Sequence, residues 1–326
     1  MSVPLLEIQD LCTYFPVRGG VLLRARAQCK AVDGVSLSIW PGETVGLVGE
    51  SGCGKSTLGK SVVRLVKPTA GRILFEGTDL ATLSVKHLKP FRRQIQMIFQ
   101  DPADSLNSRH TVGSMLEEPF IIHGIGDEAS RHESVVELLK IVGLQASAID
   151  RFPFEFSGGQ RQRIGIARAI ALNPKLIICD EPVSALDASI QSQVLNLLLD
   201  LQQRLNLSYL FIAHDLAVVK HVSDRIAIMY LGHIVESGDG EEVHRQPRHP
   251  YTRALISAIP QPIPRRGRYR QVLTGEVPSP INPPPGCPFS TRCPHVQPVC
   301  REKLPPLREV AGTGREAHAV ACHFDL

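Results

Sequence analysis

The sequence lacks a long hydrophobic run. Of its 326 residues 43% are hydrophobic, yet no apolar stretch approaches the ~18 residues that a membrane-spanning helix needs. The opening residues 1–7 show neither a basic region nor a long apolar core, so we expect no signal peptide and a cytosolic chain. A net charge of +4 is too small to argue for nucleic acid by itself. What remains is an ordinary globular composition, for which the length suggests about two domains.

Closely spaced C-x2-C pairs, typical of zinc ribbons, are absent from the last part of the chain, although it holds half of the eight cysteines. In a reducing cytosol we do not expect disulfides. Prolines dominate after residue 260, and a short basic run, 265–270, indicates solvated surface, with lipid headgroups as a minor alternative. Four thiols in a segment with little core of its own indicate a metal site, the alternative being four free thiols: Cys287, Cys293, Cys300 and Cys322.

One glycine-rich stretch stands out near the N-terminal end. It fits the pattern G-x-x-x-x-G-K-[ST], follows an apolar run at 44–48 that predicts a buried strand, and precedes a predicted helix at 57–66. Glycines allow backbone N–H groups to converge on phosphate oxygens at the start of a helix, so we predict a phosphate site rather than an empty turn. Lys55 would reach the β- and γ-phosphates and Ser56 would ligate Mg²⁺. The predicted nucleotide-binding residues here are Gly49, Glu50, Ser51, Gly52, Cys53, Gly54, Lys55, Ser56 and Thr57.

A second run, at 176–180, predicts a buried parallel strand that ends in an acid. Asp180 stands at its carboxyl end, where open α/β sheets bind ligands, and would hold Mg²⁺. Glu181 follows and would act as general base on a water. Two buried acids without a metal would be costly, which weakens a purely structural explanation.

Three further positions fit the same chemistry. Gln100 ends a β-prone run, 95–100, and could bring its carbonyl to a metal and its amide to a water; a solvated strand end is the plain alternative. Ser157 opens a helix predicted to reach 172, and the Gly-Gly-Gln that follows makes a second helix N-terminus able to hold an anion, although a simple N-cap is the better explanation of Ser157 taken alone. His214 follows an apolar run at 209–213, a position suited to a γ-phosphate.

The remaining pattern predicts strands at 5–11, 31–40 and 71–77, a hairpin at 224–238, and helices at 83–93, 112–120, 129–142 and 188–205. Tyr14 and Phe15 end the first of these strands, where an aromatic ring could stack on adenine or simply join the core.

Taken in order, these motifs resemble the ATP-binding-cassette (ABC) ATPases. The phosphate loop, Gln100, the Ser-Gly-Gly-Gln signature, Asp180-Glu181, the stretch 184–187 and His214 all occur in the family's order over residues 5–240. The longer wording, including Gln-Met-Ile-Phe-Gln-Asp-Pro, His249-Pro-Tyr-Thr and the tail Pro-Ser-Pro-Ile-Asn-Pro-Pro, is similar to the ATP-binding subunits of oligopeptide and dipeptide importers.

The resemblance implies a P-loop ABC core over 1–260, with an α/β fold in which helices flank a mixed sheet. A helical subdomain would be inserted in this core at about 101–165. A proline-rich, Cys-containing extension would follow over 261–326. It implies ATP and Mg²⁺ as ligands, and two cassettes that sandwich each ATP. Adenine would stack on Phe15 with Val32 beside it. Glu181, His214, Gln100 and Lys55 would carry catalysis, while the partner cassette would supply a γ-phosphate site and Asp187 would help to join the protomers. The residues of that γ-phosphate site are Ser157, Gly158, Gly159 and Gln160.

The same resemblance implies a [4Fe–4S] cluster on the four C-terminal cysteines, with zinc as the second choice. It implies a second ATPase subunit, a paralogue rather than an identical copy, two transmembrane permease subunits and, indirectly, an extracytoplasmic peptide-binding protein, with no nucleic acid. The chain would sit peripherally on the cytoplasmic face of the membrane. Import of another solute such as nickel stays open, as does a soluble ABC ATPase, although that class usually carries two cassettes or a coiled-coil insertion, and neither is visible here.

Overall fold

The computed structural model describes residues 3–19, 24–101, 105–259, 273, 275–310 and 317–325. It divides the chain into two compact units. The first unit contains Met1–Ile39, Thr44–Thr82 and Ile212–Leu326, and the second contains Trp40–Glu43 and Leu83–Phe211. The basic run 265–270, predicted as solvated surface, lies outside the described residues.

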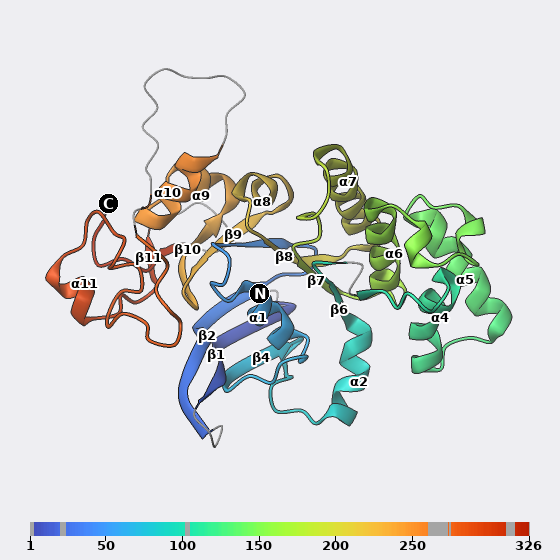
Figure 1. Cartoon of the computed structure of the whole chain (residues 1–326), viewed down its shortest axis with the longest axis horizontal. Coiled ribbons are helices and arrows are strands. Elements are labelled where there is room, and N and C mark those ends of the chain that lie inside the picture. Colours follow the sequence, from blue (N-terminus) through green and yellow to red (C-terminus); the bar gives the residue numbers. More distant parts are fainter. Residues whose placement is uncertain are drawn as a thin grey trace. The chain divides into compact units, whose positions relative to one another are not determined.

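The first unit contains an antiparallel sheet in the order β2-β1-β4-β5, drawn in blue in Figure 1. Its strands are β1 (Leu6–Gly19), β2 (Arg24–Ile39), β4 (Ala70–Phe75) and β5 (Thr78–Asp79). Helix α1 (Lys55–Val62) contacts β1 and β2. The sheet thus supports the helix that opens directly after the phosphate loop.

A second group of strands in this unit follows the order β11-β12-β10-β9-β3. Strand β3 pairs parallel with β9, whereas β9/β10, β10/β12 and β12/β11 are antiparallel, so the sheet is mixed as predicted. Every residue of β3 and β9 is buried, which agrees with their continuous apolar sequence. The strands are β3 (Thr44–Val48), β9 (Arg225–Tyr230), β10 (His233–Asp239), β11 (Arg308–Val310) and β12 (His318–Val320), and the helices are α8 (Leu216–Val222), α9 (Gly240–Arg245), α10 (Pro250–Ala258) and α11 (Pro298–Glu302).

The second unit combines strands in the order β8-β7-β6 with a group of helices. Strand β6 (Ile95–Ile98) pairs parallel with β7 (Leu176–Asp180). Strand β8 (Ser208–Ala213) belongs to this unit up to Phe211, and its last two residues are assigned to the first unit. The helices α4, α5 and α6 contact one another, and α6 also contacts α7, as the green helices of Figure 1 illustrate. The helices are α2 (Val85–Gln94), α4 (Val112–His123), α5 (Glu128–Ile141), α6 (Gly158–Ile170) and α7 (Ala188–Leu205), with 3-10 turns at Ala146–Ala148 and Pro153–Glu155.

Several predicted boundaries were wrong. The first strand was predicted to end at residue 11 and the second to begin at residue 31, but β1 continues to Gly19 and β2 begins at Arg24. The β1/β2 register shifts four times, and each irregularity interrupts the alternation by which a strand is recognised in sequence. Helix α1 ends at Val62 rather than at Val66, because Arg64 takes a left-handed conformation with φ of 58°. In the part of the chain that the structure describes, no helix has the length and hydrophobicity to cross a membrane.

Candidate nucleotide site and C-terminal cysteine pocket

The phosphate loop lies between β3 and α1, as predicted. Its glycines are required by close packing: a Cβ at Gly49 would stand 2.2 Å from the Met229 carbonyl oxygen, and one at Gly54 would stand 2.0 Å from the Ala31 carbonyl oxygen. Gly54 also has a φ of 110°, a conformation that side chains disfavour. The loop is therefore pressed against β2 and β9 within its own unit.

Lys55 is the buried cation of this loop. Its Nζ donates to the carbonyl oxygens of Gly49 at 2.7 Å and Glu50 at 3.0 Å, so the side chain folds back over the turn. The same Nζ lies 3.8 Å from the sulfur of Cys53, whose pKa is raised by burial despite the opposing charge of Lys55. A lysine held at this point can approach phosphate oxygens that the loop amides bind.

The adenine prediction divides between its two residues. Phe15 is 40% exposed on β1 and offers a face on which a base could stack. Val32 is fully buried. Its contact with a bound base stays a prediction.

The second unit brings Gln100 and Glu181 together. Parallel strands β6 and β7 end at the same edge, and Nε2 of Gln100 donates to Oε2 of Glu181 at 3.1 Å. Glu181 has a φ of 47°, a costly conformation for a residue with a side chain, and such strain concentrates at functional sites. Asp180 is buried at the end of β7. Two of the predicted catalytic side chains therefore meet at this edge of the sheet.

The signature segment also lies in the second unit and begins α6. Ser157 caps the helix by accepting from the N–H of Gln160 at 3.3 Å, and Oε1 of Gln160 accepts from the N–H of Ser157 at 3.0 Å. A Cβ at Gly159 would stand 2.4 Å from a methyl of Ile190, so this glycine permits the close approach of α6 to α7. Asp187 precedes α7 and is exposed. In the first unit, His214 is exposed after β8.

The four C-terminal cysteines line a single pocket, together with His249, His295 and His323. Burial and the neighbouring cysteine charges raise the pKa of Cys287 to about 11, against the opposing effect of a backbone N–H. Within the described residues, however, no three His, Cys, Asp or Glu side chains are placed to hold one metal ion. The iron–sulfur prediction is therefore not supported by this geometry.

Sequence reasoning missed two residues that touch the phosphate loop. Arg292 pairs with the carboxylate of Glu50, and the hydroxyl of Tyr251 accepts from the Glu50 N–H at 2.9 Å. Neither residue belongs to a nucleotide motif. Both follow the loop by more than two hundred positions, so no local pattern could reveal them.

A phosphate loop, a buried strand that ends in an acidic residue, and a capped helix that begins with two glycines together define a cassette ATPase. The family model described as "ABC transporter" matches residues 32–184, and that of the "Oligopeptide/dipeptide transporter, C-terminal region" matches residues 235–300. The chain belongs to the ATP-binding subunits of the oligopeptide/dipeptide ABC transporters. It is thus an ATPase that powers peptide import by an ABC transporter.

Full-length relatives carry this assignment. The oligopeptide transport ATP-binding protein AppF of Bacillus subtilis is 55% identical over 323 residues, which cover 98% of this chain and 97% of AppF. A putative peptide import ATP-binding protein of Brucella ovis is 52% identical, with 99% of each chain covered. Among solved structures, the dimeric cassette MJ0796 bound to ADP and Pi matches with a TM-score of 0.64 and 28% identity over 72% of this chain and 98% of that chain. The cbiO1 cassette of Clostridium perfringens matches with the same TM-score at 27% identity, over 74% of this chain and 91% of that one.

Proposed function

We propose that the chain hydrolyses ATP as one of two cassettes that close on each other. Each ATP would lie between the phosphate loop of one subunit and Ser157, Gly158, Gly159 and Gln160 of the other, with Asp187 at the contact between protomers. Two observations support this: MJ0796 is described as dimeric with ADP and Pi, and the capped N-terminus of α6 presents backbone N–H groups that suit an anion.

We assign the roles within one site from the chemistry of each side chain. Lys55 would bind the β- and γ-phosphates, His214 the γ-phosphate, and Phe15 the adenine with Val32 beside it. Ser56, Gln100 and Asp180 would hold Mg²⁺, which would offset the charge of the phosphates. Glu181 would take the proton of the attacking water. The observation that carries this proposal is the Gln100–Glu181 hydrogen bond, because it already orients the base and the residue that would position its water.

A trapped dimer tests this mechanism. Glu181→Gln keeps the hydrogen-bonding shape but removes the base, so we expect ATP to bind and the closed pair to persist in light scattering. Adding Lys55→Ala should abolish the trap, because the phosphates lose their cation. Undiminished turnover by Glu181→Gln, with no ATP-dependent dimer, would contradict the assignment.

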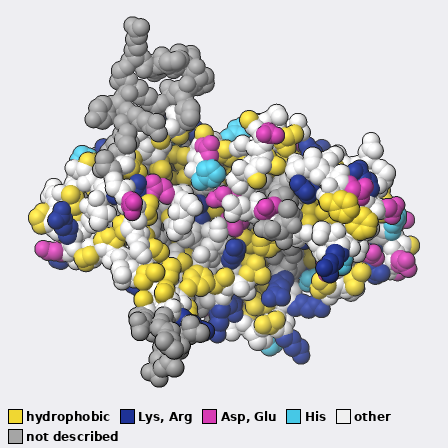
Figure 2. All heavy atoms as spheres, in the orientation of Figure 1, with side chains coloured by type: hydrophobic (Ala, Val, Ile, Leu, Met, Phe, Trp, Pro, Cys, Tyr) yellow, Lys and Arg dark blue, Asp and Glu magenta, His cyan; other side chains and the backbone are white. Residues whose placement is uncertain are grey.

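We further propose that the helices of the second unit and the Gln100 loop dock cytoplasmic helices of a permease at the cytoplasmic face of the membrane. The complex would contain two permease subunits, a paralogous second ATPase subunit and, indirectly, a peptide-binding protein. Ile121 and Ile122 on α4 are both more than half exposed. Figure 2 shows hydrophobic side chains among basic and acidic ones at its right-hand end, where Figure 1 draws α4 and α5. Such a patch suits a protein partner. Replacing both isoleucines by Asp should abolish co-purification with the permease while ATP binding persists; retained assembly and transport would contradict the proposal.

The only support for a [4Fe–4S] cluster is that its four proposed thiolate ligands, Cys287, Cys293, Cys300 and Cys322, line one pocket, although their side chains are not placed to hold one metal ion. Iron and labile-sulfide assays after anaerobic purification distinguish this cluster from zinc and from four free thiols. Colourless protein without iron would remove the cluster from the proposal.

A further inference from the structure

Arg292 connects the C-terminal segment to the phosphate loop. Its Nη1 lies 2.6 Å from Oε2 of Glu50 and its Nη2 lies 3.2 Å from Oε1, so the pair is bidentate. The Arg292 side chain is 6% exposed and that of Glu50 is 28% exposed. Both residues belong to the first unit. A two-pronged contact of this kind fixes orientation as well as distance.

Glu50 is also held through its backbone. Its N–H donates to the hydroxyl of Tyr251 on α10, and the Tyr251 ring packs 5.5 Å from the ring of Phe289. Phe289 in turn meets Tyr230 at 5.3 Å, edge to face. The guanidinium of Arg292 lies 6.0 Å from the Tyr230 ring centre. The second residue of the phosphate loop is thus tied by side chain and backbone to one aromatic cluster, formed by Tyr230, Tyr251 and Phe289.

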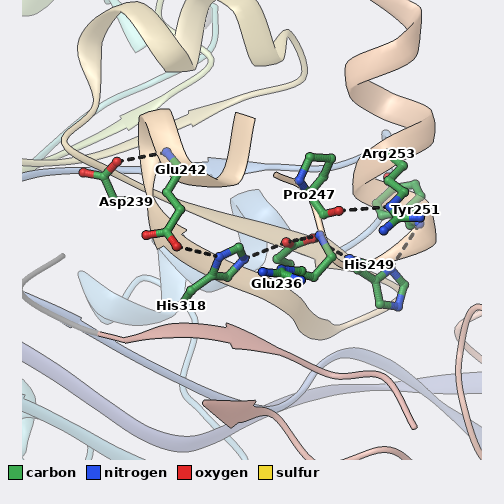
Figure 3. A network of polar contacts seen from close by, with 9 residues as sticks. Glu236, Asp239, Glu242, Pro247, His249, Tyr251, Arg253 and His318 are labelled. Atoms are coloured by element: carbon green, nitrogen blue, oxygen red, sulfur yellow. Dashed lines mark hydrogen bonds and ion pairs between the residues drawn. The ribbon is translucent and has the colours of Figure 1, made fainter. Parts of the chain in front are cut away.

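The place where the C-terminal chain docks is itself anchored by a buried carboxylate, shown in Figure 3. Glu236 on β10 accepts from the N–H groups of Arg248 and His249 at 2.7 and 2.9 Å, and pairs with Nε2 of His318 on β12 at 2.7 Å. His249 caps α10 by accepting from the Tyr251 N–H at 3.1 Å. The network therefore attaches both α10, which carries Tyr251, and strand β12 of the extension to strand β10.

The charges of Arg292 and Glu50 predict how their contact affects ATP binding. Glu50 places a carboxylate on the loop that would receive the triphosphate, and an uncompensated negative charge there would oppose ATP. Arg292 cancels that charge and withdraws the carboxylate toward the C-terminal segment. A loop held at its second residue also has less conformational freedom to lose when its amides close on phosphate.

We propose that Arg292 is a positioning residue of the nucleotide site, through which the C-terminal segment sets the affinity of the phosphate loop for ATP. The inference rests on the proposed binding of phosphate by the Lys55 loop. It assigns to the extension an action on ATP binding that is separate from any group held by its cysteines.

The test is a double-mutant cycle with a matched control. Arg292→Ala should raise the KM for ATP about tenfold, the order expected when a charged group loses its hydrogen-bond partner, while kcat stays within about threefold. Glu50→Gln should restore most of the affinity in the Arg292→Ala background, because the opposing charge is gone. Arg308→Ala removes another ion pair of the same segment, with Asp325, and should leave KM unchanged.

Each outcome has a distinct meaning. Thermal unfolding and binding of a fluorescent ATP analogue show whether a variant is folded and whether affinity itself has changed. If Arg292→Ala behaves like Arg308→Ala while Lys55→Ala loses ATP binding, the role of Arg292 is refuted and the phosphate site stands. If Glu50→Gln gives no rescue, charge compensation is refuted. If Lys55→Ala binds ATP normally, the proposed site itself is wrong.

Discussion

The phosphate loop and the Glu181 edge are held in place by different means. Glu50 depends on Arg292 and Tyr251, which come from distant parts of the chain. Glu181 depends on Gln100, delivered by a neighbouring parallel strand, and on its own strained backbone. The difference indicates that the loop can respond to the C-terminal segment, whereas the base is positioned by the strand edge that carries it.

The strongest way to break this comparison is to remove the aromatic support of the loop. Phe289 is 1% exposed between Tyr230 and Tyr251, so Phe289→Ala should lower the free energy of unfolding by about 3–5 kcal/mol. Urea unfolding measures the change. Leu307→Ala, at a position 42% exposed in the same segment, should cost far less. Equal losses of unfolding free energy in both variants would show that the aromatic cluster does not stabilise this region.

Sequence alone predicted the parts whose reasons are local. The phosphate loop, the buried run that becomes β7, and α7 with its bounds at Ala188 and Leu205 were all predicted correctly. The capping of α6 followed from Ser157 in the same way, with the anion site left open beside it. Each of these depends on residues within a few positions of one another, so a pattern can reveal it.

The parts that sequence did not predict depend on long-range packing. The bulges of β1 and β2 interrupt the alternating pattern, so about half of this hairpin was not predicted from the sequence. In the sequence Arg292 cannot be told from any surface cation, and only the structure shows that it pairs with Glu50. The predicted domain boundaries and site roles stay predictions.

The Glu181 edge can be tested without touching the loop. Gln100→Ala removes the donor that orients Glu181, and a misplaced water or base costs on the order of 100-fold in rate. We therefore expect kcat to fall by about that factor with little change in ATP affinity. Gln96→Ala is the matched control, since Gln96 lies on β6, which precedes Gln100, and donates to the Arg92 carbonyl instead. A loss of ATP affinity as large as the loss of rate would show that the main role of Gln100 is to hold Mg²⁺ and nucleotide rather than to orient Glu181.

A smaller effect is expected at the adenine side of the first unit. Loss of one aromatic stacking face costs about 1–3 kcal/mol for a base, so Phe15→Ala should weaken ATP binding about tenfold. Stability should hardly change, because the ring is partly exposed. Tyr14→Phe is the control: it removes the hydroxyl that donates to Asp33 and leaves a ring at the neighbouring position. Similar effects of both variants on Kd would argue against stacking by Phe15.

The smallest predicted effect is the pH dependence of stability contributed by His249 and His318, which both contact Glu236. Burial lowers the pKa of His249 to about 4, against the charge of Glu236, so this ring stays neutral. Burial also opposes charge on His318, but the hydrogen bond and charge of Glu236, with the charge of Glu242, raise its pKa. Stability from His249 should therefore be present above its unfolded pKa of ~6.5 and be lost as pH falls toward 4.

His318 should show the opposite dependence. A raised folded pKa means that its contribution is complete below the unfolded value of ~6.5 and is lost as pH rises through the folded pKa. His318→Gln should thus remove the alkaline slope of unfolding free energy, about 1 kcal/mol in size, and His249→Gln the acidic one. His318 contacts Glu236 through its ring, whereas His249 contacts it through its backbone N–H. A slope of the same sign in both variants would contradict the separate roles assigned to the two histidines. Opposite slopes would confirm that the C-terminal strand is docked by a charged pair and α10 by a neutral cap.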